Sequence, residues 1–218
     1  MSPLSAQLPT QMADHWWRRP GRHPGRVLYQ WHMAFHDQPA VRAVARMAQA
    51  KLAGQVGLTM VDLHLLHLTT LIAGFADEIP SAAVEKMTGI ARELLSEVAP
   101  IPVTLGKIGY HPQAITLLVE PRGALNPVLD AVRTATSDAG YEGHADTDPW
   151  LPHISLAYSH ATGPAAPIIA ALGHSVPRTE ITIRSISLVS QTQVGRSWQW
   201  QPVTEVFLAG TSACGANG

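Results

Sequence analysis

Two short stretches of the chain pair a histidine with a hydroxyl side chain two residues later. His67 and Thr69 flank one apolar residue, and His153 and Ser155 flank another. Successive side chains of a β-strand point to opposite faces, so each pair would share one face if its stretch were a strand. Each strand would then present an imidazole and a hydroxyl together, while the intervening apolar side chain packs on the core.

Two imidazoles on opposite sides of a phosphorus atom suit the opening of a cyclic phosphodiester. One imidazole acts as a base that activates water, and the other acts as an acid that protonates the departing ribose oxygen. An unperturbed imidazole titrates at about pH 6.5, so one ring can be neutral while the other is protonated. Thr69 and Ser155 could donate hydrogen bonds to the non-bridging oxygens, where charge sits in the transition state. This chemistry requires no metal, and the carboxylates near the motifs form no obvious metal cluster in the sequence.

The bare pattern of histidine, any residue and hydroxyl is not specific in this chain. The chain contains 11 histidines, and a third match occurs at His160 and Thr162. That match runs into Gly163 and Pro164 at the end of a predicted strand, so we interpret it as accidental. The other two matches lie within predicted strands, each after a helix and a loop in its half of the chain. This equivalent placement favours a functional pair.

Hydrophobic periodicity and turn residues predict an alternation of strands and helices. The predicted strands cover residues 27–36, 63–72, 101–108, 114–120, 152–159, 180–190 and 198–208. The predicted helices cover residues 39–52, 81–98, 125–139 and 164–172, and Ser81 can cap the second of them. Because hairpins occur between the helices, this order favours an α+β fold over a doubly wound parallel sheet. The two halves have a similar element order, which predicts two pseudo-symmetric lobes with antiparallel or mixed sheets around a central cleft.

The composition indicates a folded chain with no strong charge bias. Apolar residues make up 46%, charged residues 14%, and the formal net charge is -1. These values argue against a disordered protein, a coiled coil or a basic coat for DNA. Cys214 is the single cysteine, which excludes an intramolecular disulfide and a cysteine-based zinc site. No secretory signal or membrane-spanning run is recognisable, so we expect a cytoplasmic protein without a membrane partner.

A chain of 218 residues suits one domain, or two lobes that share one core. We expect a tail or flap at residues 1–25, a bilobed domain at 26–208 and a tail at 209–218. The stretch 15–26 carries four arginines, two histidines and two tryptophans. It could cover the cleft, with arginines on phosphates and tryptophans on bases. A solvated tail whose tryptophans cover apolar surface is the favoured interpretation.

The segments LHLTTL and PHISLAYS, with their spacing and the element order, resemble the two-histidine (2H) phosphoesterase superfamily. Within it they resemble the branch of 2′-5′ RNA ligase-like proteins and RNA 2′,3′-cyclic phosphodiesterases, over about residues 27–208. The resemblance implies a bilobed α+β fold in which the two motif strands face each other across a central cleft. It also implies that His67 protonates the leaving group and that His153 activates water.

Four aromatic residues near the motifs carry weaker signals. Trp150 directly precedes the second motif, where it could bind substrate by stacking or plug the junction between the lobes. His64 is predicted on the strand face opposite the first motif and is interpreted as structural. His32 and His36 could line the cleft, although positions in the core or at a sheet edge are favoured.

Further candidates follow from charge or from strand periodicity alone. Trp198 and Trp200 share a face of the last predicted strand, which more often indicates core than ligand binding. Lys107, Arg122 and Arg184 are candidate phosphate contacts only because they are basic.

We therefore expect a metal-independent phosphodiesterase without a cofactor. Its substrate would be an RNA 3′ end or a small nucleotide with a 2′,3′-cyclic phosphate, which it hydrolyses to a 2′-phosphate. The same groups could also form a 2′-5′ linkage in the reverse reaction, and no glycine-rich Walker loop indicates a need for ATP. The alternative is a non-catalytic module of the same fold that binds a cyclic nucleotide or RNA end. A metal site at His64 and His67 is disfavoured, because three-residue spacing suits a helix rather than a strand.

Overall fold

A computed structural model describes residues 8–16, 25–145 and 149–210 of the chain. Its strands are β1 (Gln11–Met12), β2 (Leu28–Ala34), β3 (Leu58–Met60), β4 (His67–Phe75), β5 (Ile101–His111), β6 (Ala114–Glu120), β7 (His153–Ser159), β8 (Gly163–Pro164), β9 (Ser175–Ile183), β10 (Ser185–Val194) and β11 (Ser197–Phe207). Its helices are α1 (Pro39–Leu52), α2 (Ser81–Ser96), α3 (Asn126–Asp138) and α4 (Ala166–Leu172).

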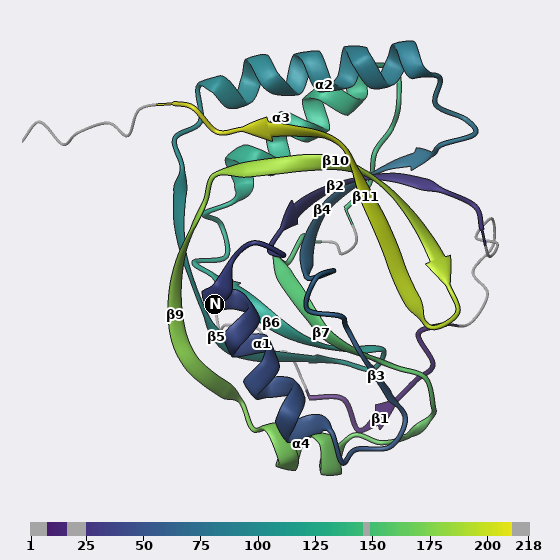
Figure 1. Cartoon of the computed structure of the whole chain (residues 1–218), viewed down its shortest axis with the longest axis vertical. Helices are drawn as coiled ribbons and strands as arrows, with labels where there is room; N and C mark the ends of the chain where they lie inside the picture. The colour runs from purple at the N-terminus through teal and green to yellow at the C-terminus, as the bar shows by residue number, and fades with distance from the viewer. Residues whose placement is uncertain (1–7, 17–24, 146–148, 211–218) are drawn as a thin grey trace, which may run out of the picture.

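Two larger sheets form the body of the molecule (Figure 1). The β4 sheet has the strand order β11-β10-β2-β4, and the β7 sheet has the order β3-β7-β6-β5-β9. The short strands β1 and β8 pair with each other. All of these strand pairs are antiparallel. The predicted α+β fold is confirmed, and its sheets are antiparallel rather than mixed.

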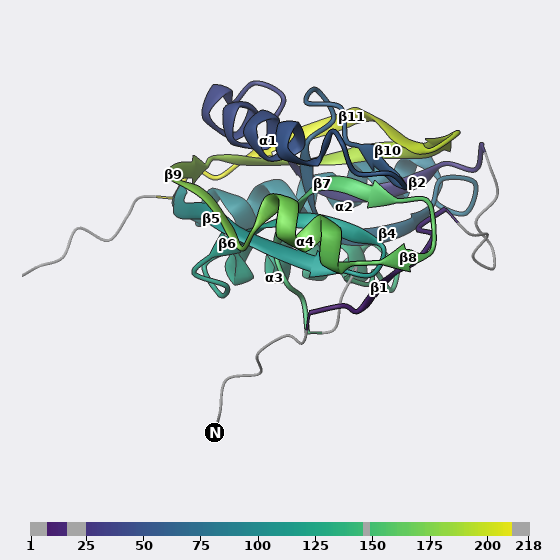
Figure 2. The same cartoon turned by 90° about the horizontal axis from the view of Figure 1, so that it is seen from below.

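Each large sheet has a pair of helices on its outer side (Figures 1 and 2). Helices α2 and α3 contact each other and pack against β11 and β4, whereas α1 and α4 contact each other and α1 packs against β9 and β7. The indole Nε1 of the fully buried Trp31 in β2 donates to Thr136 Oγ1 of α3 over 3.2 Å, so this side chain points outward toward the helices. The inner faces of the two sheets are left to face each other.

The two lobes do not correspond to the two halves of the sequence. The β4 sheet takes β2 and β4 from the first half of the chain and β10 and β11 from its end. The β7 sheet takes the strands between them, with β3, β5, β6, β7 and β9. Each motif strand therefore belongs to a different sheet, although the chain crosses between the sheets several times.

The helices form where the apolar periodicity predicts them. In α1 the buried residues recur at helical spacing, and Pro39 occupies the first turn, where its missing N–H costs no helical hydrogen bond. The cap predicted for α2 is wrong. Pro80 is the N-cap and has extended backbone angles, so Ser81 lies inside the first turn and no side chain caps the helix.

Two predicted strands differ from the structure by more than a few residues at their ends. The strand predicted at 63–72 begins only at His67, because a turn closes just before it. The backbone N–H of His64 donates to Asp62 Oδ1 over 2.8 Å, and that of Leu65 donates to the Asp62 carbonyl over 2.9 Å. The strand predicted at 180–190 is divided at Arg184 into β9 and β10, which belong to different sheets. Local periodicity does not reveal this division, since both pieces have the character of a strand.

Candidate active site

A cavity of about 510 Å³ lies between the inner faces of the two sheets. His67 and Thr69 line it from β4, and His153 and Ser155 line it from β7. The apolar residue inside each motif points the other way and is fully buried. The two strands contact each other although they belong to different sheets. The structure thus brings all four predicted motif residues to one cleft.

Both motif histidines are held by the same type of backbone contact. Nδ1 of His67 lies 2.7 Å from the carbonyl oxygen of Leu65, and Nδ1 of His153 lies 2.8 Å from the carbonyl oxygen of Leu151. A carbonyl oxygen only accepts hydrogen bonds, so each Nδ1 carries a proton in this arrangement. Nε2 is then the ring nitrogen whose protonation can change. Each ring can accept a proton at Nε2 when neutral and donate one there when charged.

A third histidine, His32 of β2, packs against the first motif. Its ring stacks on that of His67 with centroids 4.1 Å apart and an interplanar angle of 10°. Its Nε2 lies 3.3 Å from Gln30 Oε1 and 3.4 Å from Thr69 Oγ1. Burial lowers the pKa of His32 well below its usual range, and the nearby His67 lowers it further. His32 is therefore neutral, and it supports both residues of the motif.

Trp200 of β11 completes the surroundings of His67. Its Nε1 donates over 3.1 Å to the carbonyl oxygen of Leu65, the same oxygen that faces His67 Nδ1. The indole also meets the His67 ring edge-on, with centroids 6.0 Å apart. The periodicity of β11 favoured a core position for this tryptophan, but the side chain is only partly buried and positions a cavity residue.

An aromatic wall closes one side of the cavity. The ring of His15 stacks on Tyr158 with centroids 4.2 Å apart, and Trp198 Nε1 donates to His15 Nε2 over 3.0 Å. The backbone N–H of His15 donates to the carbonyl oxygen of Ser159 over 2.9 Å, which fixes this part of the N-terminal segment. All three rings line the cavity and offer surfaces on which a base can stack. Most of the basic stretch predicted as a flap or tail, residues 17–24, lies outside the described residues.

The three basic residues singled out by charge lie in different places. Arg122 lines the cavity that holds the motifs. Lys107 Nζ lies 2.6 Å from Glu120 Oε1, so it forms an ion pair away from the cavity. Arg184 lines a separate, larger cavity. Arg122 is therefore the one of these three that can approach a phosphate at the motif histidines.

Trp150 is not among the residues that line the cavity. Its Nε1 donates to the carbonyl oxygen of Thr69 over 3.3 Å, and its ring packs against the hydrophobic core. This contact connects the segment before β7 to β4, and thereby connects the two motif strands. A contact between Trp150 and substrate stays a prediction.

Two glutamines of the cavity wall were not singled out from the sequence. Gln30 and Gln191 are only 2% and 5% exposed, and both line the cavity from the β4 sheet. Within the described residues, Gln191 Oε1 is buried without a hydrogen-bond partner. An unpaired buried acceptor is costly unless a ligand or water satisfies it. Gln30 lies within a run that the sequence predicts as a buried strand, which was the available signal, whereas the polar sequence around Gln191 gave none.

Comparison with known proteins identifies the family. A family model described as the 2′-5′ RNA ligase superfamily matches residues 35–195, which include both motifs. The chain belongs to the 2′-5′ RNA ligase superfamily. This membership confirms the resemblance to two-histidine phosphoesterases that the motifs indicated.

One curated relative from this superfamily shares part of the chain. The RNA 2′,3′-cyclic phosphodiesterase of Bacillus subtilis (strain 168) is 31% identical over 96 residues, which cover 42% of the chain and 50% of the relative. The match thus spans about half the length of that relative.

Solved structures show the fold of this 2′-5′ RNA ligase superfamily member. The Thermus thermophilus protein TT0787 superposes with a TM-score of 0.66 at 24% identity, over 86% of this chain and all of the other. LigT of E. coli, in its complex with 3′-AMP, superposes with a TM-score of 0.59 at 16% identity, over 85% and 98% of the two chains. At these identities the likeness establishes the shared α+β fold.

Two features of the described residues concern metal ions and membranes. Within residues 8–16, 25–145 and 149–210, no group of three or more His, Cys, Asp or Glu side chains is placed to hold a metal ion. In the same part of the chain, none of the helices combines the length and apolar character of a membrane span.

Proposed function

We propose that the protein hydrolyses 2′,3′-cyclic phosphates, on RNA 3′ ends or on nucleotides, to 2′-phosphates without a metal ion or cofactor. The observation that carries this proposal is the matched geometry of His67 and His153. Each Nδ1 donates to the carbonyl two residues earlier, and both rings line one cavity. Two such rings can serve as an acid and a base. The partial match to an RNA 2′,3′-cyclic phosphodiesterase supports the same reaction class.

In the proposed reaction, neutral His153 removes a proton from water through Nε2 while the water oxygen bonds to phosphorus. The bond between phosphorus and O3′ breaks, and protonated His67 gives its Nε2 proton to the departing O3′. The products are a 2′-phosphate and a free 3′-hydroxyl, and proton exchange with solvent restores both rings. Thr69 and Ser155 donate hydrogen bonds to the non-bridging oxygens as charge develops there. A 5′-hydroxyl in place of water would give a 2′-5′ linkage by the same steps.

The first test follows the 2′-phosphate product by chromatography, with 2′,3′-cyclic nucleotides and a cyclic-phosphate-ended oligonucleotide, each with and without EDTA. We expect turnover in EDTA and losses of about 10²- to 10⁴-fold in His67→Ala and His153→Ala. His160→Ala is the matched control, because it removes the third histidine of the same sequence pattern. His160 Nδ1 lies 3.0 Å from Thr59 Oγ1, outside the cavity, so this variant should keep full activity.

Three results would contradict the proposal. Loss of turnover in EDTA would point to a metal-dependent reaction. Equal turnover in all variants would remove the two histidines from the mechanism. Saturable binding of the cyclic nucleotide with no product, by the unmodified protein, would favour a binding module of the same fold.

A substrate with sulfur in place of the bridging O3′ tests the roles of the two histidines. A thiolate leaves without protonation, so it removes the need for an acid but not for a base. We expect this substrate to restore most of the activity of His67→Ala and little of that of His153→Ala. If this substrate restores activity only in His153→Ala, then His153 is the acid and His67 is the base.

A further inference from the structure

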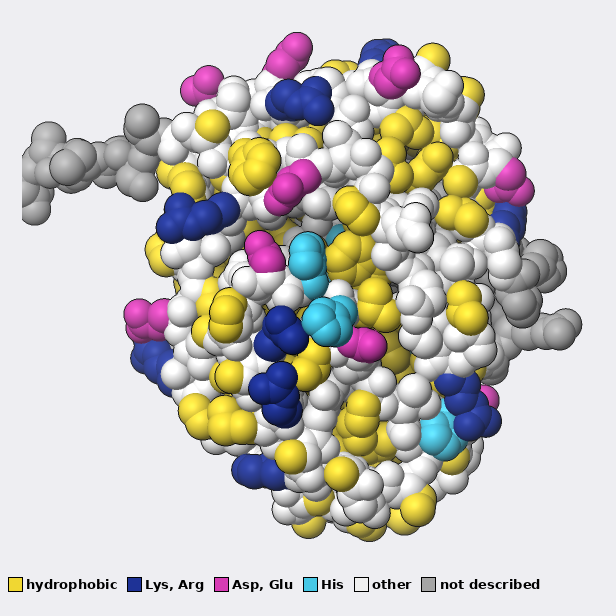
Figure 3. Space-filling model, in the orientation of Figure 1, with side chains coloured by type: hydrophobic (Ala, Val, Ile, Leu, Met, Phe, Trp, Pro, Cys, Tyr) yellow, Lys and Arg dark blue, Asp and Glu magenta, His cyan; other side chains and the backbone are white. Residues whose placement is uncertain are grey.

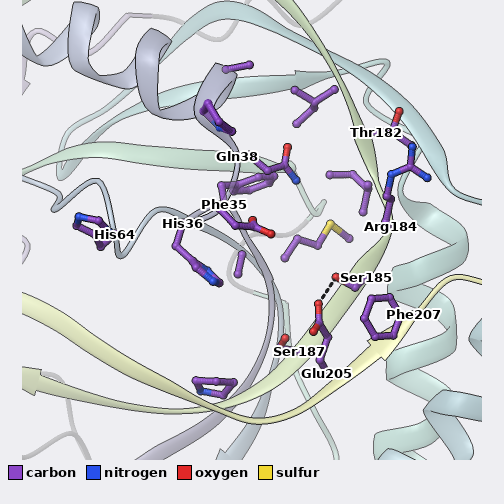
Figure 4. A pocket seen from close by; sticks show the side chains of 18 of the residues that line it. Phe35, His36, Gln38, His64, Thr182, Arg184, Ser185, Ser187, Glu205 and Phe207 are labelled. Atoms are coloured by element: carbon purple, nitrogen blue, oxygen red, sulfur yellow. Dashed lines mark hydrogen bonds between the residues drawn. The ribbon is translucent and has the colours of Figure 1, made fainter.

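A second cavity of about 980 Å³ lies on the side of the β4 sheet where α1 begins. Its wall combines β9, β10 and β11 with the segment from Met33 to Ala40, and Trp200 and Leu65 separate it from His67. Figure 4 shows this cavity from close by. Figure 3, in the orientation of Figure 1, shows a hollow near the middle of the molecule with histidine, basic and acidic side chains around it. Its volume is at the upper end of the range for small-molecule sites.

Several exposed cationic or hydrogen-bonding side chains face this cavity without a hydrogen-bond partner among the described residues. Arg184, His36 and His64 line it, and none of their side chains donates a hydrogen bond or forms an ion pair within the described residues. The hydroxyl of Ser187 is also without a hydrogen bond to any described residue, although this residue is only 7% exposed. This hydroxyl can therefore bond to water or to a ligand in the cavity.

The first turn of α1 adds donors at the same place. Gln38, Pro39 and Ala40 line the cavity, the helix has no side-chain cap, and no acidic residue lies in its first turn. The N-terminal N–H groups and the helix dipole of a 14-residue helix favour an anion there. In Figure 4, Gln38, Thr182 and Arg184 lie toward one end of the cavity, which makes that end suitable for a phosphate group.

The other end of the cavity has a different character. The partly buried Trp200 and the ring of His36 lie edge-to-face with centroids 6.1 Å apart, and they offer aromatic surface. Glu205 also lines the cavity, and its Oε1 accepts a hydrogen bond from Ser185 Oγ over 2.6 Å. Asp37, the other carboxylate named here, directly precedes the N-cap of α1 and so belongs to the first end. A carboxylate and a hydroxyl suit the donors of a ribose or a base but not a second phosphate.

We propose that this cavity is a second ligand site, distinct from the motif cavity, that binds a nucleoside monophosphate. Its phosphate lies between Arg184 and the start of α1. Its ribose and base lie toward Trp200, with Ser187 and Glu205 as hydrogen-bond partners.

Two contacts connect this site to His67. Ser187 of β10 is the direct cross-strand neighbour of His32, whose ring stacks on His67. Trp200 and His67 also donate to the same carbonyl oxygen, that of Leu65. A ligand that moves Trp200 or binds Ser187 therefore changes the surroundings of the His67 ring. This effect on turnover rests on the proposed function, whereas binding at the second site does not.

Calorimetric titration of AMP into the full chain tests the site. We expect Arg184→Gln to weaken AMP binding by about 10-fold or more, the loss of one charge-assisted contact. Arg133→Gln is the control, since Arg133 of α3 pairs with Asp130 and neither residue lines the cavity. Arg122→Gln in the motif cavity should leave this binding event unchanged. Inorganic phosphate and adenosine, tested separately, should each bind more weakly than AMP.

Three results of these titrations would overturn the proposal. Equal AMP affinity in Arg184→Gln and the unmodified protein would show that the second cavity does not bind the nucleotide. Loss of all AMP binding in Arg122→Gln, but not in Arg184→Gln, would place AMP in the motif cavity alone. Phosphate binding as tightly as AMP would reduce the site to an anion site without nucleoside recognition.

A kinetic arm separates this proposal from the proposed function. With a 2′,3′-cyclic substrate, AMP should change KM or kcat of the unmodified protein, and this effect of AMP should be lost in Arg184→Gln. Binding that depends on Arg184 without any turnover in the unmodified protein would contradict the enzyme and keep the second site. If the unmodified protein turns over substrate but AMP binding does not depend on Arg184, the enzyme proposal stands and the second site is contradicted.

Discussion

Replacement of His32 by phenylalanine tests how the buried imidazole contributes to stability. Phenylalanine keeps an aromatic ring against His67 but removes the group that can take up a proton. It also removes the hydrogen bond between His32 Nε2 and Gln30 Oε1, which are 3.3 Å apart. The variant therefore changes both the stability at neutral pH and its dependence on pH.

The pH dependence has a definite sign. Burial holds the folded-state pKa of His32 well below the value of about 6.5 that it has in the unfolded chain. Between these two values the unfolded chain binds a proton at His32 and the folded chain does not. The free energy of unfolding therefore falls as pH falls below about 6.5, by up to ~1.4 kcal/mol for each pH unit. Above about pH 6.5 His32 is neutral in both states, so this loss of stability does not occur there.

The loss of the hydrogen bond acts at every pH. It leaves the buried oxygen of Gln30 without its partner, which should cost about 1–3 kcal/mol. Removal of His32 Nδ1, which is buried without a partner among the described residues, offsets part of this cost. We expect the variant to be less stable than the unmodified protein at about pH 8. The difference should shrink by on the order of 1 kcal/mol at about pH 5.5, because only the unmodified protein loses stability at His32.

Urea unfolding followed by tryptophan fluorescence at several pH values measures this difference. His160→Phe serves as the control, since His160 is only partly buried and its replacement should leave most of the pH dependence intact. Parallel loss of stability in the unmodified protein and His32→Phe between about pH 8 and 5.5 would refute the assignment of a neutral, protonation-resistant His32.

Two other substitutions probe the wall of the motif cavity. Gln191→Leu removes a buried carbonyl oxygen that has no partner among the described residues, so urea unfolding should show equal or greater stability, by up to ~1 kcal/mol. If that oxygen binds substrate, KM should rise in the same variant, and unchanged KM would exclude the contact. Gly109→Ala would place a Cβ 2.6 Å from Thr116 Oγ1 and 2.8 Å from Leu118 Cδ2, so thermal unfolding should show a loss of about 1–3 kcal/mol. Gly89→Ala in α2 is its control, because it meets no atom within 4 Å and should stabilise the helix by about 0.5–1 kcal/mol.

The sequence was sufficient for features that depend on local periodicity. The spacing of apolar residues predicted α1 with the bounds seen in the structure, and strand alternation placed His67 with Thr69 and His153 with Ser155 on common faces. These predictions succeeded because a helix or strand exposes its pattern within a few residues. The predicted α+β class also followed from the order of the elements.

Features that depend on long-range packing could not be predicted in this way. His15 reaches the cavity wall only because β1 pairs with β8 and its backbone bonds to Ser159. The division of one predicted strand at Arg184 depends on the partners of β9 and β10, which lie in different sheets. Trp198 and Trp200 were correctly placed on one face of a strand, but periodicity does not say whether that face meets the core or a cavity. Such outcomes are decided by strand register, which a local pattern does not specify.

The two motifs are alike in sequence and backbone contact, whereas an acid and a base must differ. The structure provides a difference in their surroundings. His67 is 8% exposed, stacks on the neutral ring of His32 and shares a carbonyl with Trp200. His153 is more exposed and, in the described residues, has no second histidine stacked on it. Because the motif geometry is duplicated, the motifs themselves do not distinguish the acid from the base. The difference must come from the neighbours of His67, which are His32 of β2 and Trp200 of β11. Substitutions at His32 and Trp200 should therefore alter the pH profile of turnover, while a purely structural role would change stability alone.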